Sequence, residues 1–226
     1  PVSRVLVAVL DMAGTTIADD GVVEASFTAA MSAVGLGPET SRFSSAHDYV
    51  LATMGRSKIE VFRHVLPDET LAQQANKAFE DAYERQVRAG AVSPIKGAAE
   101  VITELRGRGI RVALTTGFAP RTRDLILQSV GWGDVADLVL APSDAGRGRP
   151  YPDMNLVALM QLGGTSVREL LVAGDTSSDM AAAANAGASV RVGVRTGAGT
   201  DEELWDNGAT HVMDDITALP GLLPFT

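Results

Sequence analysis

Val5-Leu6-Val7-Ala8-Val9-Leu10-Asp11 is the stretch that decides the expected fold, because six apolar residues lead directly into a carboxylate. A short apolar run bounded by turn-forming residues is typical of a strand buried on both faces of a parallel sheet. The run is too short for the core of a signal peptide, and no small-residue cleavage site follows it. We therefore interpret residues 5–10 as a strand with Asp11 at its carboxyl end.

Further apolar runs alternate with segments of helical pattern through the second half of the chain. These runs are Arg111–Leu114, Leu138–Ala141, Leu170–Ala173 and Val190–Val194. Alternation of strand and helix predicts a parallel sheet with right-handed crossovers. The first strand fits best as the central member of this sheet. The expected fold class is therefore α/β, with a Rossmann-like parallel sheet as its core.

The region after the first strand has a different pattern and reads as nearly all helix. Helices are expected at Val22–Val34, Ser57–Val65 and Asp68–Arg88. In the third helix an apolar stripe leaves Glu80 and Glu84 on the side that faces water. We predict that residues 19–92 form an inserted all-helical cap domain. Residues 1–18 and 93–226 would then form the core, whose strands bind ligands at their carboxyl ends.

Composition narrows the possible chemistry. The chain has 46% hydrophobic and 21% charged residues, and no apolar run long enough to span a bilayer, so a cytoplasmic protein without a membrane partner is expected. It has no cysteine, which excludes disulfides, thiolate metal sites and a cysteine nucleophile. A formal charge of −9 argues against nucleic-acid binding. Small-molecule substrates are favoured, and any metal must bind through oxygen or histidine.

Four polar motifs each fall at the end of an expected strand. They are Asp11-Met12-Ala13-Gly14-Thr15-Thr16, Thr115-Thr116-Gly117, Gly148-Arg149-Pro150-Tyr151-Pro152 and Gly174-Asp175-Thr176-Ser177-Ser178-Asp179. Taken singly, each has an ordinary explanation as a turn, a helix cap, a solvated arginine or an acidic helix start. Together they supply a nucleophile, phosphate donors, a positive charge and metal ligands, a combination that chance explains poorly.

These residue types suit phosphoryl chemistry. A carboxylate that attacks a dianionic phosphoryl group meets like-charge repulsion, so an arginine and a cation must neutralise charge as the transition state forms. Ligands that are all oxygen suit Mg²⁺. A covalent intermediate divides one difficult displacement into two easier ones, the second being attack by water.

In this order the four motifs resemble the haloacid dehalogenase superfamily, and the resemblance covers the whole chain, including the insertion after the first strand. It implies that Asp11 is the nucleophile that forms an aspartyl-phosphate and that Arg149 balances the charge. The residues implied to bind the phosphoryl group or the substrate are Thr15, Thr115, Thr116 and Gly117. The resemblance also implies Mg²⁺ as cofactor, with protein ligands drawn from Asp11, the Ala13 carbonyl, Asp175 and, directly or from close by, Asp179.

One departure narrows the substrate. Most phosphatases of this superfamily carry a second aspartate two residues after the nucleophile to protonate the leaving alcohol, and here that residue is Ala13. The motif Asp-x-Ala-Gly-Thr-Thr instead resembles the phosphonoacetaldehyde hydrolase family, which cleaves a carbon–phosphorus bond after a cap lysine forms a Schiff base with the aldehyde. The stretch Met54-Gly55-Arg56-Ser57-Lys58 resembles that family's lysine motif. By this resemblance Lys58 is the Schiff-base candidate and Met54 a substrate-binding candidate.

Two positions differ from that family. Its histidine three residues after the lysine is Val61 here, and its tyrosine after the Thr-Thr-Gly motif is Phe118. Both differences remove polar groups that would serve proton transfer or substrate binding. His64 lies one turn beyond Val61 and offers a substitute, although an ordinary surface role also explains it. Lys58 itself has a second reading, as an ionic partner for the anionic end of a substrate.

The leading hypothesis is therefore Mg²⁺-dependent hydrolysis of a small carbonyl phosphonate. The first alternative is a phosphate monoesterase of the phosphoglycolate phosphatase type, in which the substrate or a cap residue replaces the missing acid. The second is a phosphate-binding regulatory module without turnover. A homodimer is also expected, because the alanine-rich segment Val22–Val34 resembles surfaces that pair in the phosphonatase family.

Overall fold

The computed structural model describes residues 4–223 and contains a six-stranded parallel sheet. In spatial order the strands are β5 (Leu138–Leu140), β4 (Arg111–Thr115), β1 (Val7–Asp11), β6 (Leu170–Gly174), β7 (Val190–Val194) and β8 (His211–Met213). The predicted α/β class and the central place of the first strand are both confirmed. Because the strands are parallel, their carboxyl ends lie along one edge of the sheet.

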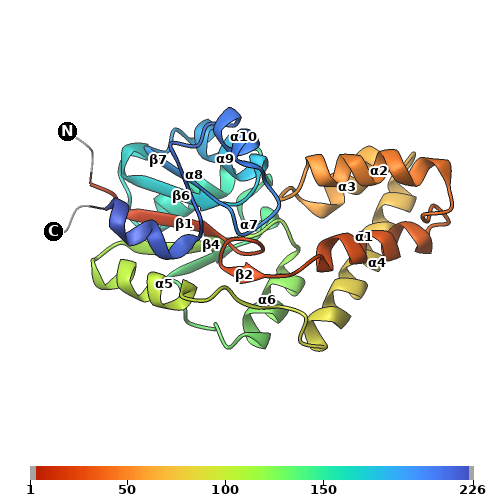
Figure 1. Ribbon diagram of the computed structural model, residues 1–226, viewed down its shortest axis with the longest axis horizontal. Coiled ribbons are helices and arrows are strands. Elements are labelled where there is room, and N and C mark those ends of the chain that lie inside the picture. The colour runs from red at the N-terminus through yellow and green to blue at the C-terminus, as the bar shows by residue number, and fades with distance from the viewer. Residues whose placement is uncertain (1–3, 224–226) are drawn as a thin grey trace.

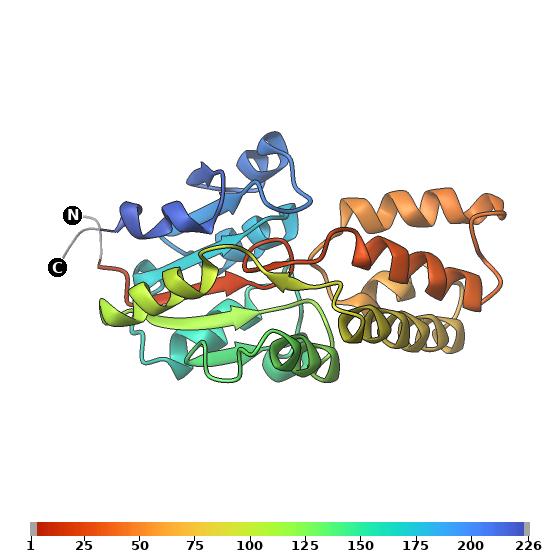
Figure 2. The ribbon, with the colours of Figure 1, turned by 60° about the horizontal axis from the view of Figure 1, so that its bottom comes forward.

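Helices cover both faces of this sheet (Figure 2). The core helices are α5 (Ala98–Gly107), α6 (Pro120–Ser129), α7 (Pro142–Ala145), α8 (Asp153–Gln161), α9 (Ser177–Ala186) and α10 (Asp201–Asp206), with 3₁₀ turns η1 (Val167–Glu169) and η2 (Ile216–Leu222). Successive side chains of β1 enter different apolar clusters: Ala8 and Leu10 belong to one, Val7 and Val9 to the other. A strand buried on both faces explains why its sequence is continuously apolar.

The inserted segment forms a separate layer of four helices. They are α1 (Val22–Ala33), α2 (Ser41–Ala52), α3 (Lys58–Val65) and α4 (Glu69–Arg88). Figure 1 shows these helices beyond the end of the sheet toward which β1 and β4 point. The two connections, β2 (Ile17–Ala18) and β3 (Ser93–Pro94), pair with each other as an antiparallel ribbon. The helical layer, here called the cap, thus lies over the carboxyl ends of the strands.

Helix α2 and strand β8 are among the elements that were not predicted, and each has a weak sequence pattern. Helix α2 buries only Ala46 and Val50, so its twelve residues show little apolar periodicity. Strand β8 has three residues and lies at the edge of the sheet. The central strand also ends one residue later than expected, so that Asp11 itself belongs to β1.

The prediction that Glu84 faces water is wrong. Its side chain is buried, and its Oε2 atom lies 2.7 Å from Nη2 of Arg121 in α6. Helix α4 is long enough to pack on the other cap helices along one stripe and on α6 of the core along another. An acidic side chain is tolerated on the second stripe because an arginine of the core pairs with it.

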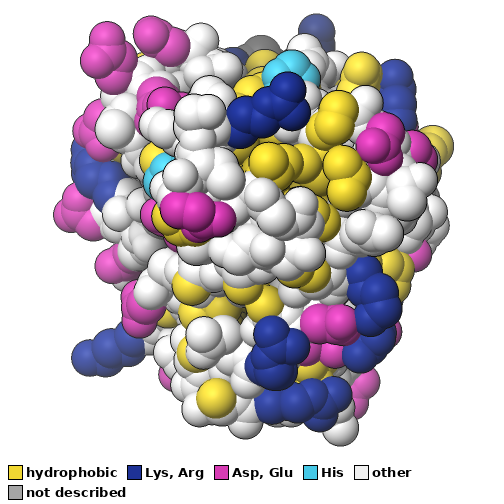
Figure 3. Space-filling view, turned by 90° about the vertical axis from the view of Figure 1, so that its right-hand side faces the viewer, with side chains coloured by type: hydrophobic (Ala, Val, Ile, Leu, Met, Phe, Trp, Pro, Cys, Tyr) yellow, Lys and Arg dark blue, Asp and Glu magenta, His cyan; other side chains and the backbone are white. Residues whose placement is uncertain are grey.

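The surface of the cap is mixed. Figure 3 looks onto the cap end of the molecule, where hydrophobic side chains are visible between charged ones. Leu51 in α2 is among the large apolar residues that stand exposed. Within residues 4–223, no helix combines the length and the apolar character needed to cross a membrane.

Candidate active site

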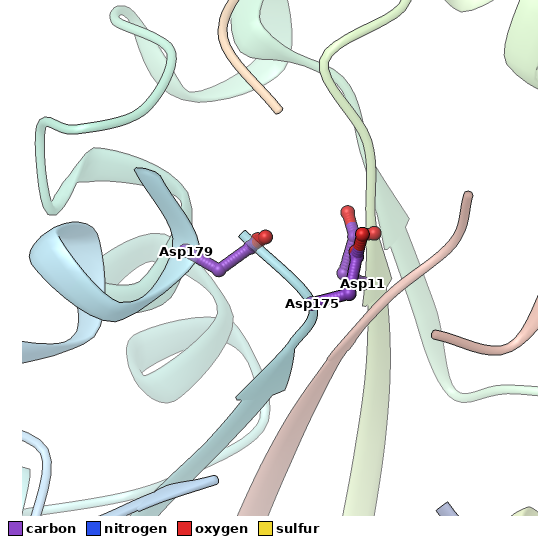
Figure 4. A group of neighbouring side chains, drawn as sticks. All are labelled: Asp11, Asp175 and Asp179. Carbon is purple, nitrogen blue, oxygen red and sulfur yellow. The ribbon is translucent and has the colours of Figure 1, made fainter. Parts of the chain in front are cut away.

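Three carboxylates converge at the carboxyl edge of the sheet. Asp11 ends β1, Asp175 directly follows the neighbouring strand β6, and Asp179 lies in the first turn of α9. Figure 4 shows Asp11 and Asp175 side by side, with Asp179 pointing toward them from its helix. One oxygen of each lies within 4.8 Å of the others, and all three side chains are buried.

Arg149 joins this cluster to the cap. Its Nη2 atom lies 2.7 Å from Oδ1 of Asp11, and its Nε atom lies 2.8 Å from Oδ1 of Asp179. It also donates to Oγ1 of Thr115 at 2.7 Å and to the backbone carbonyl of Gly55 at 3.2 Å. The guanidinium is 6% exposed, and these four contacts compensate for its burial.

The other two carboxylates of the cluster, Asp175 and Asp179, are held by different partners. Asp175 accepts from Oγ1 of Thr15 at 3.2 Å and from the backbone N–H of Ala198 at 2.9 Å. Asp179 pairs with Arg149 through one oxygen, while its other oxygen accepts from the backbone N–H of Thr176 at 3.1 Å. Asp175 and Asp179 thus each have both oxygens engaged by protein groups.

The charge of this cluster favours a cation. Burial raises the pKa of Asp175 to about 7, and the negative charge of Asp179 adds to the effect. Burial also raises the pKa of Asp11 well above its usual value, although Arg149 opposes that shift. One guanidinium cannot balance three carboxylates, and a divalent cation would keep all three ionised.

Two glycines, Gly14 and Gly197, pack so closely against the Asp175 carboxylate that a side chain at either position would clash with it. A Cβ atom added to Gly14 would lie 2.4 Å from Oδ2 of Asp175, and one added to Gly197 would lie 1.8 Å from it. Oxygen-only donors in such a confined, buried cluster fit Mg²⁺. The residues present therefore fit the cofactor that the sequence motifs imply.

The Thr115-Thr116-Gly117 loop follows β4 and contacts the cap. Oγ1 of Thr116 accepts from the backbone N–H of Phe118 at 3.2 Å. A Cβ atom at Gly117 would lie 2.6 Å from the carbonyl oxygen of Arg56 and 2.7 Å from that of Gly55. Only glycine at position 117 allows the cap loop between α2 and α3 to approach the core this closely.

Most of the predicted site residues line one cavity of about 260 Å³. These are Asp11, Ala13, Met54, Lys58, Thr116, Gly117, Arg149 and Asp175. Thr15, Thr115 and Asp179 are not among its lining residues: Thr15 contacts Asp175, and the other two contact Arg149. A larger groove of about 890 Å³ lies on the other side of Lys58 and Arg149, which line both spaces.

Lys58 is the first residue of α3 and reaches the cavity from the cap. Its Nζ atom lies 5.4 Å from the centre of the Phe118 ring and 3.5 Å from the carbonyl oxygen of Arg56. Burial lowers the pKa of Lys58 to about 8, although the charges of Asp19 and Asp11 oppose the shift. A buried lysine of this kind has a much larger neutral fraction near neutral pH than an exposed one.

Two residues that the sequence did not single out lie beside Lys58. Asp19 comes from the connection between β2 and α1 and lines the same cavity. Its Oδ2 atom accepts a hydrogen bond from the hydroxyl of Tyr83 in α4 at 3.3 Å. The Tyr83 ring is fully buried, with its centre 4.4 Å from that of Phe118. In the sequence Asp19 is one of two adjacent acidic linker residues, and Tyr83 only interrupts a helical pattern.

The histidines lie elsewhere. His64 stacks on Tyr49 with ring centres 3.9 Å apart and lines the larger groove, not the cavity that holds Asp11. His47 lies 3.5 Å from Glu24 in the cap. His211 contacts its neighbour Thr210 at 2.9 Å. Val61 is buried in the apolar core, so the position that carries a histidine in the phosphonatase family has a packing role here.

Comparison with known proteins identifies the family of this chain. A family model for haloacid dehalogenase-like hydrolases matches residues 5–187. Phosphonoacetaldehyde hydrolase of Bacillus cereus is 35% identical over 161 residues, which is 69% of this chain and 60% of the relative. That of Bacillus anthracis is 37% identical over 123 residues, which is 54% of this chain and 46% of the relative. The chain thus spans about half to three fifths of the length of these relatives.

Solved structures share the fold. A phosphonoacetaldehyde hydrolase-like protein from Oleispira antarctica superposes with a TM-score of 0.83 at 23% identity, covering 98% of this chain and 92% of the other. A predicted phosphoglycolate phosphatase from Haemophilus somnus superposes with a TM-score of 0.80 at 16% identity, covering 98% and 99%. At these sequence identities the superpositions show a shared fold, which comprises the α/β core and the helical cap.

Proposed function

Because this chain belongs to the haloacid dehalogenase-like hydrolases, we propose that it cleaves the carbon–phosphorus bond of a small carbonyl phosphonate of the phosphonoacetaldehyde type. The observation that carries the proposal is the presence of Lys58 and Asp11 in one cavity, with Ala13 where a phosphatase would hold its acid. The relatives named phosphonoacetaldehyde hydrolase support this choice of substrate.

The core side of the cavity would act on the phosphoryl group. The Asp11 carboxylate attacks phosphorus and forms an aspartyl-phosphate, which water then hydrolyses. Arg149 holds Asp11 at 2.7 Å and offsets negative charge as the transition state forms. Thr116 and Gly117 line the cavity where the phosphoryl oxygens would bind. Thr115 would act indirectly, by fixing the position of Arg149.

The Mg²⁺ ion would be held by Asp11, the backbone carbonyl of Ala13 and Asp175. Thr15 would orient Asp175, to which it donates a hydrogen bond. Asp179 would support the site by holding Arg149, with which its Oδ1 atom pairs at 2.8 Å. When bound, Mg²⁺ neutralises charge on the phosphoryl oxygens.

The cap side would activate the leaving group. The neutral amine of Lys58 attacks the aldehyde and forms an iminium ion, which accepts the electron pair released when the carbon–phosphorus bond breaks. With a pKa of about 8, roughly a tenth of the Lys58 side chains are neutral at pH 7. Met54 also lines the cavity and would pack against the two-carbon unit.

Borohydride trapping tests the proposal. Incubation with phosphonoacetaldehyde and borohydride should inactivate the enzyme and add the mass of the reduced adduct at Lys58, as read by peptide mass spectrometry. Lys58→Arg, which keeps the charge but is not nucleophilic, is the matched control and should stay unlabelled. Turnover of phosphonoacetaldehyde with no adduct on the native protein would rule out the Schiff-base mechanism.

A second function, phosphate monoesterase activity, is favoured by one observation. The Asp19 carboxyl lines the cavity, and burial raises its pKa, so it is placed to replace the missing acid and protonate a leaving alcohol. A panel of small phosphomonoesters, phosphoglycolate included, assayed with Mg²⁺ distinguishes the two functions. Ester hydrolysis that survives in Lys58→Arg would support the esterase, and no phosphate release from any ester would exclude it.

We also propose that the chain acts as a homodimer through the cap. The exposed residues of α1 include three alanines at a spacing of four, Ala25, Ala29 and Ala33, beside the polar residues Glu24 and Ser32. Small residues in this arrangement allow two helices to approach closely. Light scattering on the native protein and on Ala29→Arg measures the mass; a monomeric native protein would contradict the proposal.

A further inference from the structure

Schiff-base formation at Lys58 requires a group that takes protons from the amine and returns them to the departing oxygen. Two protons must make this journey for each iminium ion formed. At the positions where the phosphonatase family has a histidine and a tyrosine, this chain has Val61 and Phe118, which carry no exchangeable proton. A different residue must therefore transfer these protons.

The residues around Lys58 identify a candidate. Asp19 lines the cavity into which Lys58 reaches, and its negative charge favours the protonated form of Lys58 and so opposes the lowering of its pKa by burial. Asp19 and Lys58 line the same cavity of about 260 Å³, in which the carbonyl group of a small substrate would bind. The carboxylate comes from the cap linker, which lies outside the Asp11, Asp175 and Asp179 cluster.

Tyr83 determines where the Asp19 carboxylate lies. Its hydroxyl donates to Oδ2 of Asp19 at 3.3 Å, while its ring is fully buried against Phe118 and Phe79. Burial and the charge of Asp19 raise the pKa of Tyr83 well above its usual value, so the hydroxyl stays a hydrogen-bond donor. Phe118 also lies beneath the Lys58 amine, so one aromatic cluster sets the positions of both reacting groups.

We propose that Asp19 is the proton-transfer residue for Schiff-base formation at Lys58 and that Tyr83 is its positioning residue. The proposal rests on the proposed phosphonatase function and adds the missing acid–base group to it. Asp19 acts on the carbonyl end of the substrate, whereas Asp11 acts on phosphorus.

The steps balance as follows. Asp19 takes a proton from the Lys58 ammonium, and the free amine attacks the carbonyl carbon. Asp19 gives that proton to the resulting alkoxide and takes another from the positively charged nitrogen, leaving a neutral carbinolamine. It then gives this second proton to the hydroxyl, which leaves as water while the iminium bond forms. Of the three ammonium protons, two depart with water and one stays on nitrogen, and Asp19 ends ionised as it began.

The charges around the amine make the test selective. Lys58 is faced by Asp19, Asp11 and Asp175, which favour its charged form, and by Arg149, which opposes it. Removing the charge of Asp19 must therefore lower the pKa of Lys58 and increase the neutral, nucleophilic fraction of the amine. If Asp19 were only an electrostatic neighbour, Asp19→Asn would form the imine faster at neutral pH. A proton-transfer residue predicts the opposite.

The experiment measures the rate of borohydride trapping by phosphonoacetaldehyde as a function of pH. We expect Asp19→Asn to reduce the maximal rate about 100-fold, while the pH at which the rate rises moves downward. Asp19→Glu should recover part of the rate, and Tyr83→Phe should lose about tenfold. Asp20→Asn, which removes the same charge one residue away, is the matched control and should trap at the native rate.

The outcomes separate the two proposals. If the native protein forms no adduct, the Schiff-base function fails and this inference falls with it. If the native protein is labelled and Asp19→Asn traps at the native rate or faster, only the inference fails. Thermal unfolding and the binding of beryllofluoride with Mg²⁺ at Asp11 show whether Asp19→Asn is folded. If it is not, an unchanged rate in Tyr83→Phe overturns the positioning role, and no recovery in Asp19→Glu overturns the proton-transfer role.

Discussion

The core side and the cap side of the cavity are built in different ways. On the core side, Asp11, Thr116 and Asp175 each stand at or just after the end of a neighbouring parallel strand, so the sheet itself brings them together. On the cap side, Lys58, Asp19 and Tyr83 come from three different elements and meet only through helix packing. A sheet edge thus places functional side chains together through short local motifs, whereas a helical cap places them together through contacts between segments that are distant in the sequence.

The largest expected effect is that of Asp11→Asn, which should abolish the activity of the core side and leave that of the cap side unchanged. Asp11→Asn should lower turnover by at least about 10⁴-fold, because the nucleophile is lost. Imine trapping at Lys58 should continue, since the cap side is unchanged. Rapid-quench phosphate release and peptide mass spectrometry on the same sample measure the two activities. Loss of both would show that the sides are not independent, and retained turnover would refute Asp11 as the nucleophile.

Arg149 contacts both sides, so its replacement should affect both. Arg149→Lys keeps the charge but cannot reach Asp11, Asp179, Thr115 and the Gly55 carbonyl at once. We expect kcat to fall by about 10² to 10³-fold. Steady-state kinetics with phosphonoacetaldehyde provide the measurement, and Arg147→Lys, at an exposed position two residues away, provides the control. Near-native kcat would contradict the assigned role.

Burial of Lys58 on the cap side should lower the free energy of unfolding, and the lowered pKa of Lys58 determines how this loss depends on pH. Its pKa is about 8 in the folded protein, against an ordinary value of 10.5, so the folded state binds fewer protons between these values. The free energy of unfolding therefore rises with pH across this window. Lys58→Met should be more stable than the native protein by up to about 3 kcal/mol at pH 7. The gain should shrink as pH rises from about 8 to 10.5 in urea unfolding, and a constant difference would contradict burial as the cause.

The smallest expected effect is a loss of stability when the ion pair between Glu84 of the cap and Arg121 of the core is removed. Arg121→Gln removes the partner of the buried Glu84, and because the arginine itself is largely exposed the expected loss is about 1 kcal/mol. Arg85→Gln, at an exposed position of α4, should change stability by less than about 0.5 kcal/mol. Urea unfolding measures both variants. Equal values would show that the Glu84–Arg121 pair does not stabilise the packing of cap on core.

The same contrast explains what could be predicted from the sequence. The strands were found because burial on both faces requires apolar runs, and polar residues at their ends then marked Asp11, Thr116 and Asp175. Lys58 was found through a local motif. Asp19 and Tyr83 were missed because 64 residues separate them and no periodicity links a linker to a helix. Glu84 was misassigned for the same reason, since its partner Arg121 lies in α6, 37 residues further along the chain.

One feature of Arg149 has a thermodynamic consequence. The same guanidinium contacts the carboxylate of Asp11 and the backbone carbonyl of Gly55 in the cap. A ligand on Asp11 that shifts this guanidinium therefore changes how firmly the cap rests on the core. Because linkage between binding equilibria is reciprocal, any change in the contact between cap and core would change the affinity of Asp11 for that ligand by an equal free energy. The stability of the cap–core contact and ligand binding at Asp11 would then be two sides of one equilibrium.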